Sequence, residues 1–220
     1  MNKATISADI VSSSSLTKIQ RQKLDGELND LIEILTEEFS EKSFYGRIIK
    51  GDYLECVIEK PKMALRIALL IKSYIKSLDF EQDNPTRSFI KFKTYGIRIA
   101  VGIGALSLFD KTSGIIDGEA IYLSGRAVNE ITNTKQTLAF RSNKKKWDDC
   151  FDSTFNFLDF LLNKYTTMQC KVLYYKLLGK SEKEIAKILN KSISTVNQHS
   201  TSIGWYAVAS AVQYFEKTIR

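Results

Sequence analysis

Histidine is almost absent from this sequence, since His199 is the only one in 220 residues. The three cysteines, Cys56, Cys150 and Cys170, are far apart and form no Cys-x-x-Cys pair. This composition excludes a zinc site built from clustered Cys and His residues, and it excludes catalysis by a pair of histidines. Few and widely spaced cysteines also favour a reducing compartment.

Long apolar segments and disordered tracts are missing as well. The run Ala64–Ile71 is too short to span a bilayer, and the N-terminus lacks the apolar core of a signal peptide. We therefore expect a cytoplasmic protein with no membrane partner. Only two prolines occur, no tract is rich in Ser and Gly, and hydrophobic residues make up 44% of the chain, so we expect well-packed cores.

Basic residues exceed acidic ones, and most of the excess lies in the last third of the chain. The net charge is +7, from 32 Lys and Arg against 25 Asp and Glu. Residues 1–141 contain 20 basic and 18 acidic residues, whereas residues 142–220 contain 12 and 7. A cationic C-terminal segment is what binding to the phosphates of a nucleic acid requires.

Within this cationic segment, the sequence has the pattern of two short helices joined by a tight turn. Ser181 and Glu184 form a predicted capping box, and Asn190 ends the first helix at a position that favours the left-handed conformation. Ser192 or Ser194 can cap the second helix. The pattern predicts a helix-turn-helix, whose second helix can enter the major groove of DNA, and the alternative is an ordinary hairpin of a helical bundle.

The same residues resemble the DNA-binding domain shared by LuxR-type regulators and the last domain of sigma factors. The resemblance depends on Glu184-Ile185-Ala186, Leu189, Ser192, Thr195-Val196, His199 and Ile203. It implies that DNA is a partner. Asn and Gln side chains suit adenine edges, and lysines suit phosphates. The expected DNA contacts are Lys191, Ile193, Ser194, Thr195, Asn197, Gln198 and His199.

The first two thirds of the chain alternate between strand and helix patterns. Strands are predicted at 5–11, 44–49, 53–58, 97–106 and 138–141, and helices at 16–40, 61–78 and 119–131. The order β-α-β-β-α-β predicts an α+β domain of ferredoxin-like topology, followed by an all-α helix-turn-helix domain. The predicted boundaries are 1–142 for the first domain, 143–152 for a linker and 153–220 for the second domain.

Two aspartates are brought together by this predicted topology. Asp9 lies near the end of the first strand and Asp52 in the turn of the central hairpin, and these strands are neighbours in the sheet. Together the two carboxylates could hold Mg²⁺ or Mn²⁺ with phosphate oxygens and water. Taken singly, each fits a turn or a cap. Ser12 and Ser13 could offer N–H groups to phosphates, or could simply cap and turn the chain.

Four segments resemble the class III nucleotide cyclases. They are Ala8-Asp9-Ile10, Gly51-Asp52-Tyr53-Leu54, Ile99–Gly104 and Gly118–Arg126. The resemblance implies that Asp9 and Asp52 hold the metal, and that Tyr122 and Arg126 of a second subunit meet the triphosphate, so a homodimer is expected. Residues 117–127 are also similar to the SatD family, a bacterial group of ill-defined biochemistry with a cyclase-like fold.

Departures from the cyclase pattern count against catalysis. Tyr122 occupies the position of the family's Asn, and the base-selecting lysine expected near Ile48 is missing, although Arg47 and Lys50 flank it as candidate nucleotide contacts. We therefore expect a DNA-binding transcriptional regulator whose cyclase-like domain binds a nucleotide or mediates dimerisation. The alternative is a metal-dependent nucleotidyl cyclase that the C-terminal domain targets, with Tyr122 and Arg126 as catalytic residues. A cyclase-like scaffold without activity is a third hypothesis.

Overall fold

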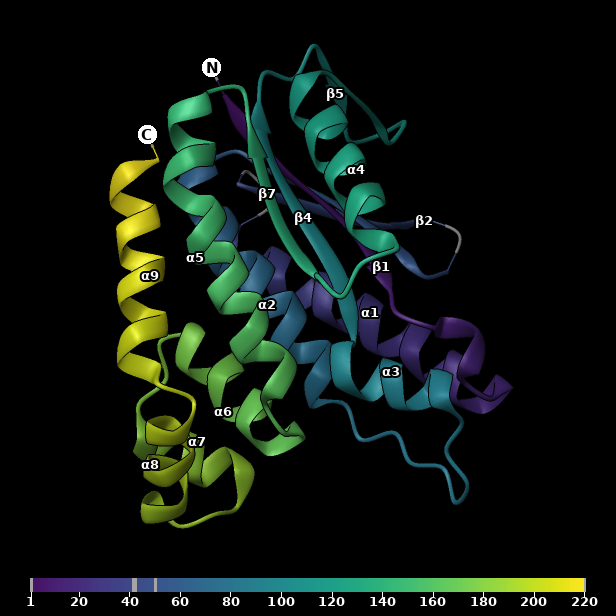
Figure 1. The fold of residues 1–220 in the computed structure, drawn as a ribbon, viewed down its shortest axis with the longest axis vertical. Helices are drawn as coiled ribbons and strands as arrows, with labels where there is room; N and C mark the ends of the chain where they lie inside the picture. Colours follow the sequence, from purple (N-terminus) through teal and green to yellow (C-terminus); the bar gives the residue numbers. More distant parts are fainter. Residues whose placement is uncertain (1, 41–42, 50, 220) are drawn as a thin grey trace.

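The computed structural model describes residues 2–40, 43–49 and 51–219, which form a five-stranded sheet, a small hairpin and the helices around them (Figure 1). The sheet has the strand order β2-β3-β1-β4-β7, and neighbours are antiparallel except for β4 and β7. The strands are β1 (Lys3–Ile10), β2 (Phe44–Ile49), β3 (Tyr53–Ile58), β4 (Ile97–Gly104), β5 (Leu108–Asp110), β6 (Ile115–Asp117) and β7 (Leu138–Ser142).

Helices separate and follow the strands, so the predicted α+β class is confirmed. The α-helices are α1 (Lys18–Phe39), α2 (Ala64–Ser77), α3 (Arg87–Tyr95), α4 (Glu119–Thr132), α5 (Lys145–Lys164), α6 (Thr167–Leu177), α7 (Glu182–Leu189), α8 (Ile193–Ser202) and α9 (Trp205–Thr218). Two short 3₁₀ turns are η1 (Ser13–Ser15) and η2 (Pro61–Met63). Among the described residues, no helix is both long and apolar enough to cross a membrane.

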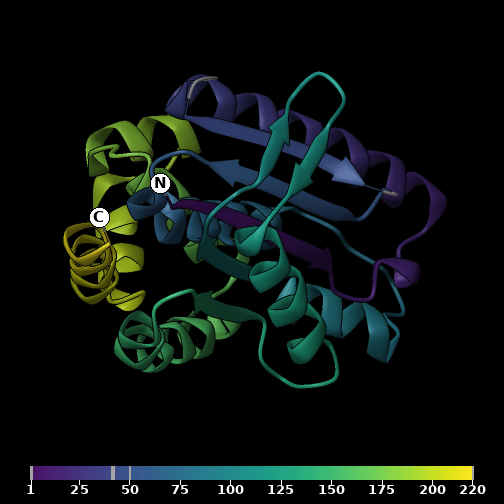
Figure 2. The same cartoon turned by 90° about the horizontal axis from the view of Figure 1, so that it is seen from above.

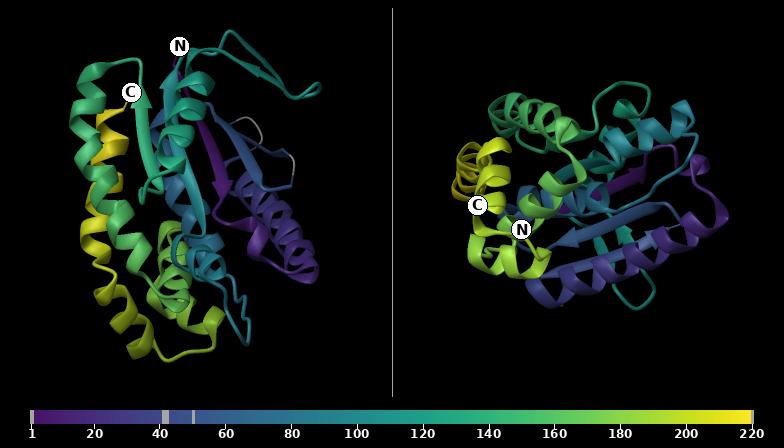
Figure 3. Two further views of the ribbon diagram at one scale, coloured as in Figure 1. Left: turned by 45° about the vertical axis from the view of Figure 1, so that its right-hand side comes forward. Right: turned by 90° about the horizontal axis from the view of Figure 1, so that it is seen from below.

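The two faces of the sheet carry different side chains because strand residues alternate in direction. On β1, Ile6 points into the main core, whereas the hydroxyls of Thr5 and Ser7 lie on the other face, each within 2.9 Å of Ser124 Oγ on α4. Helix α4 covers this second face, and α1 lies across the sheet from it (Figure 2). The β5–β6 hairpin projects beyond the sheet (Figure 3).

The helical C-terminal segment shares the main core of the sheet. Phe140 on β7 packs against Phe151 and Phe155 of α5 and against Phe215 of α9, with ring centroids 5.1–5.7 Å apart. One continuous cluster of buried side chains extends from Ala4 to Ile219. Helix α6 packs along α2 of the first segment. The last third of the chain is therefore joined to the sheet by an extensive apolar contact.

One prediction about the elements was wrong. Residues 145–152 begin α5 and form no linker, because Trp147, Phe151 and Phe155 repeat at four-residue spacing and are buried against β7 and α9. Helix α3 lies in the stretch before β4 for which no element was predicted, and its Phe89 and Phe92 are buried. Each of these two helices begins with an exposed basic residue, Lys145 or Arg87.

Candidate functional site

The two aspartates expected to hold a metal do lie next to each other at the end of β1. Strands β1 and β3 are antiparallel with Asp9 opposite Tyr53, and the Ile10 amide donates to the Asp52 carbonyl at 3.1 Å. The carboxylate of Asp52 accepts a hydrogen bond from Ser13 Oγ at 2.7 Å. The backbone thus places both residues at the same end of the sheet, where β1 ends and β3 begins.

A cation of the protein itself already occupies one side of this acidic pair. Arg98 lies directly opposite Asp9 on β4, and its Nη1 donates to Asp9 Oδ2 at 2.9 Å. Burial raises the pKa of the Asp9 carboxyl above its usual value, the Arg98 guanidinium opposes this shift, and the nearby Asp52 carboxylate adds to it. Arg98 therefore supplies the positive charge that a metal ion would bring.

The donor set here is small for a divalent cation. Among the described residues, no group of three or more His, Cys, Asp or Glu side chains is arranged to hold a metal. Mg²⁺ can be held by one or two carboxylates when phosphate oxygens and water complete its shell. Asp9 and Asp52 meet that minimum, but Arg98 already bonds Oδ2 of Asp9, so the residues fit a metal together with a bound phosphate better than a metal alone.

Ser12, Ser13 and Ser15, in the serine run beside Asp52, already make local hydrogen bonds. Ser12 has φ +54°, in the left-handed region, and its carbonyl accepts from both the amide and the hydroxyl of Ser15. The hydroxyl of Ser13 is used by Asp52. The hollow that Ser13 and Asp52 share with Arg21 and Asp25 measures about 140 Å³, below the 300–1,000 Å³ usual for small-molecule sites.

Arg47, a candidate nucleotide contact, is held by other residues. Its Nε and Nη2 donate to Glu55 at 3.0 and 2.5 Å, and its Nη1 donates to the carbonyl of Gly114, next to the β5–β6 hairpin. The guanidinium is therefore occupied on all three nitrogens and joins β2 to that hairpin. The second candidate in this region, Lys50, lies outside the described residues.

Tyr122 and Arg126 lie on one face of α4, as their four-residue spacing predicts. Both are exposed, whereas Ala120, Ser124 and Ala127 face the sheet. Asp9 lies on the sheet strand that α4 covers, so these two side chains point away from it within one chain. A site that combines them with Asp9 and Asp52 would need a second copy of the protein.

The helix pair near the C-terminus begins and ends where the sequence predicts. Ser181 and Glu184 form the capping box, with 3.3 Å from the Glu184 amide to Ser181 Oγ and 2.8 Å from the Ser181 amide to Glu184 Oε2. Asn190, at the end of α7, has φ +50° and so adopts the left-handed conformation. Ser192 caps α8, because its Oγ accepts a hydrogen bond from the Thr195 amide at 3.0 Å. These local predictions are confirmed.

One face of α8 is open to solvent. Val196 and Ser200 are buried against the rest of the helical segment, and Thr195 and His199 are half-buried. The exposed positions are Lys191, Ile193, Ser194, Asn197 and Gln198.

Asn197 contacts α7 through a small polar network. Its Nδ2 donates to Glu182 Oε2 at 3.1 Å, and Lys176 on α6 donates to the same carboxylate at 3.1 Å. Both hydrogen bonds lower the pKa of Glu182. Glu182 thus fixes one candidate base-reading side chain and is itself neutralised by a lysine.

Comparison with known proteins gives neighbours in fold and no relatives in sequence. No family model matches the chain, and no curated protein matches it. Its structural neighbours are bacterial adenylyl cyclases. One bacterial light-regulated adenylyl cyclase is 22% identical, with a TM-score of 0.43 over 63% of this chain and 74% of that one. A second is 19% identical, with a TM-score of 0.45 over 64% of this chain and 42% of that one.

This likeness concerns the fold alone. It covers under two thirds of the chain, and no match extends to a SatD-like or LuxR-type family. Membership of those families and a role of the helix pair on DNA therefore stay predictions.

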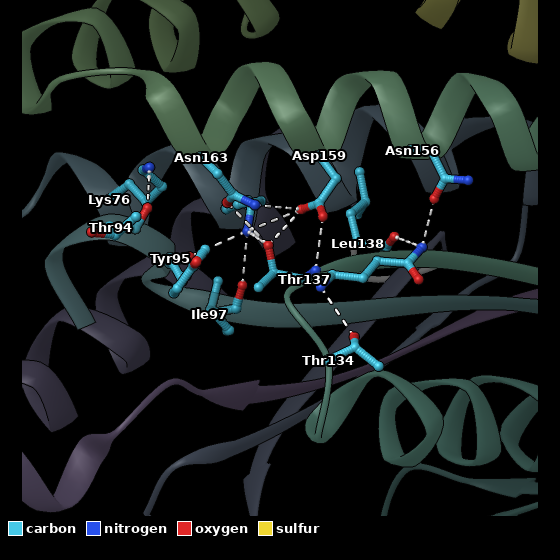
Figure 4. A network of polar contacts seen from close by, with 12 residues as sticks. Lys76, Thr94, Tyr95, Ile97, Thr134, Thr137, Leu138, Asn156, Asp159 and Asn163 are labelled. Atoms are coloured by element: carbon cyan, nitrogen blue, oxygen red, sulfur yellow. Dashed lines mark hydrogen bonds and ion pairs between the residues drawn. The ribbon is translucent and has the colours of Figure 1, made fainter. Parts of the chain in front are cut away.

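A buried polar network that the sequence did not indicate lies between α2 and α5 (Figure 4). The Lys72 ammonium donates to the Ile97 carbonyl at 3.0 Å and to Thr137 Oγ1 at 2.7 Å, and it lies 3.9 Å from Asp159 Oδ1. Asp159 also accepts from the Thr137 amide at 2.9 Å and from Asn163 Nδ2 at 3.1 Å. Burial lowers the pKa of Lys72 to about 7, and the Asp159 carboxylate opposes that shift.

Proposed function

We propose that this protein is a DNA-binding regulator that contacts duplex DNA through α8, and that its cyclase-like segment binds a nucleotide or mediates dimerisation. The observation that supports the proposal best is the exposed polar face of α8, which follows a capped three-residue turn after α7. Asn197 and Gln198 lie on that face, and their amides suit an adenine edge. Asn197 would exchange its bond to Glu182 for a base.

The charges around this face favour phosphate binding. Lys183 and Lys187 are exposed one turn apart on α7, so they lie on one side of that helix, and Lys191 is exposed in the turn that follows. Of the two acids on α7, Glu182 is paired with Lys176, and Glu184 accepts hydrogen bonds from Ser181. Positioning on a duplex comes mostly from such phosphate contacts.

Removing two of these lysines should weaken DNA binding and its salt dependence. Each lost phosphate contact lowers the slope of log affinity against log salt by about 0.9, so Lys187→Ala/Lys191→Ala should reduce it by about two. Fluorescence anisotropy with a labelled random-sequence duplex measures this slope. The matched control is Lys60→Ala/Lys62→Ala, which removes two exposed lysines of the turn before α2. Equal slopes in both double variants would contradict DNA binding through α7 and α8.

A second candidate function is nucleotidyl cyclisation by a homodimer. The observation in its favour is the backbone hydrogen bond from Ile10 to Asp52, which brings the two aspartates close enough for the Asp52 carboxylate to raise the pKa of Asp9. Mg²⁺ or Mn²⁺ bound there with a triphosphate would stabilise charge on the phosphate oxygens. Tyr122 and Arg126, exposed on α4, would reach that triphosphate from the second copy. Against it stands the ion pair between Arg98 and Asp9.

This second candidate predicts a cyclic nucleotide when the protein is incubated with nucleoside triphosphates and Mn²⁺. Asp52→Ala should abolish the product, because the variant loses one of the two carboxylates proposed to hold the metal. Asp110→Ala, which removes an exposed carboxylate of the β5–β6 hairpin, should leave turnover unchanged. Chromatography of the products is the measurement. Absence of cyclic product with all four triphosphates would reject this candidate and leave the DNA proposal standing.

A further inference from the structure

An open hollow of about 460 Å³ lies where α5 faces α3 and the segment before β7, and its lining residues include neither of the two aspartates nor any residue of α8. Its volume falls within the 300–1,000 Å³ usual for sites of small organic ligands. The surface of the hollow is mostly apolar. Six residues of its lining carry the chemistry: Lys135, Gln136, Asn156, Asp159, Phe160 and Lys164.

The acidic residue in the hollow is buried and engaged in hydrogen bonds. Asp159 is only 5% exposed, and its two oxygens accept hydrogen bonds from Thr137 and Asn163 and lie beside the Lys72 ammonium (Figure 4). Among the residues that the structure describes, no other acidic side chain lines this hollow, whereas Lys135 and Lys164 line it and are exposed. Its charge therefore suits a ligand with a negative group.

Two amide side chains of the hollow, Gln136 and Asn156, together provide a hydrogen-bond acceptor and a donor. Gln136 Nε2 donates to Asn156 Oδ1 at 2.8 Å and to the Leu138 carbonyl at 2.9 Å. These bonds fix both amides, and they leave Gln136 Oε1 and Asn156 Nδ2 without a partner among the described residues. An adjacent acceptor and donor match the donor and acceptor on the edge of adenine.

Three different chemical groups follow one another along α5. Asn156, Phe160 and Lys164 are spaced by four residues, so they lie on one stripe of the helix about 6 Å apart. Phe160 is 57% exposed, a large fraction for an aromatic ring, and Lys164 Nζ lies 4.0 Å from its centroid. Along α5, Asn156 thus offers an amide to the edge of a base, Phe160 offers a ring for stacking, and Lys164 offers an ammonium group to an anion.

We propose that this hollow binds a nucleoside monophosphate with an adenine base, at a site separate from the Asp9 and Asp52 carboxylates. The base stacks on Phe160 with its edge toward Gln136 and Asn156, and the phosphate meets Lys164. No metal takes part, because Asp159, the one carboxylate that the described part of the chain places in the hollow, is buried and hydrogen-bonded. The site joins α3 and α5, so a bound nucleotide would bridge the sheet and the helical segment.

Equilibrium dialysis of the full chain with adenosine monophosphate in EDTA tests this site. Saturable binding of one molecule per chain is expected. Phe160→Ala should weaken it about ten-fold through lost stacking, and Lys164→Ala about ten-fold through a lost charge-assisted hydrogen bond. Phe157→Ala and Lys146→Ala are the matched controls, because both residues are exposed on α5 outside the hollow, and both should bind like wild type.

Several outcomes would overturn the proposal. The first is that the protein does not bind adenosine monophosphate, and the second is that Phe160→Ala binds it as tightly as wild type. The third is that inorganic phosphate binds as tightly as the nucleotide, and the fourth is that Asp52→Ala loses binding. Because EDTA removes divalent cations and α8 is untouched, a negative result here leaves the DNA and cyclase tests unaffected. Circular dichroism of the variants confirms that each exposed substitution leaves the fold intact.

Discussion

Replacing Asp159 by alanine is expected to lower the free energy of unfolding by about 3–5 kcal/mol below pH 7, where the Lys72 ammonium is charged. Lys72 is fully buried, and Asp159 is the carboxylate that faces it at 3.9 Å. Without that carboxylate a buried charge keeps only neutral partners, namely the carbonyls of Tyr95 and Ile97 and the hydroxyl of Thr137. The amide of Thr137 would lose its acceptor as well.

Urea unfolding of two further variants separates the ion pair from general effects of substitution. Asp152→Ala removes an exposed carboxylate of α5 whose pair with Arg141 lies at the surface, so it should cost less than about 1 kcal/mol. The double variant Lys72→Met/Asp159→Leu removes both buried charges and should recover most of the loss. A loss under about 1 kcal/mol in Asp159→Ala would show that Lys72 is not buried as described.

The same lysine should make stability depend on pH. The pKa of Lys72 is about 7 in the folded protein and 10.5 in the unfolded chain. Between these values the unfolded chain binds more protons at this lysine, so the contribution of Lys72 to the free energy of unfolding rises as pH increases from about 7 to about 10.5. Lys72→Met should lack this rise. Urea midpoints of both proteins across that range measure it, and parallel curves would contradict the lowered pKa.

Features that depend on nearby residues could be predicted from the sequence. The capping box at Ser181, the left-handed Asn190 and the cap at Ser192 each involve residues no more than four positions apart. The hairpin strands 44–49 and 53–58 were also found at their observed bounds, because a glycine turn separates two β-rich runs. The approach of Asp9 to Asp52 followed from the order of the strands alone.

Features set by distant contacts could not be predicted in the same way. Arg47 is held by the carbonyl of Gly114, 67 residues later, and nothing in the local pattern indicates that partner. The Lys72 network joins α2, the start of β7 and α5, so it needs the whole fold. Arg98 is different, since its place opposite Asp9 follows from the antiparallel register of β1 and β4.

The position of α5 is an intermediate case. Its apolar side chains recur at helical spacing in the sequence, yet the lysine run at 144–146 was interpreted as a linker. Charged residues are common on the exposed side of a first helical turn, so charge alone does not separate a linker from a helix. The buried rings of Phe151 and Phe155 show that this stretch is helical and packed, and that the sheet and the C-terminal helices share one core.

Gly102→Ala on β4 is expected to lower the free energy of unfolding by about 2–3 kcal/mol, because it forces α4 away from the sheet. A Cβ at Gly102 would lie 2.3 Å from the Ala120 carbonyl oxygen and 2.6 Å from the Ser124 amide nitrogen. Both are backbone atoms, so no side-chain rotation relieves the clash. Moving α4 would also break the hydrogen bonds of Ser124 to Thr5 and Ser7.

Gly125→Ala on α4 is the matched control for this substitution, and it should change stability in the opposite direction. No atom lies within 4 Å of the position of its Cβ, and alanine in a helix interior is favoured over glycine by about 0.5–1 kcal/mol. Thermal unfolding of both variants gives the comparison. Equal stability of Gly102→Ala and wild type would mean that α4 does not lie this close to β4. Tyr122 and Arg126 would then lose the placement on α4 that makes a second copy necessary for any site shared with Asp9.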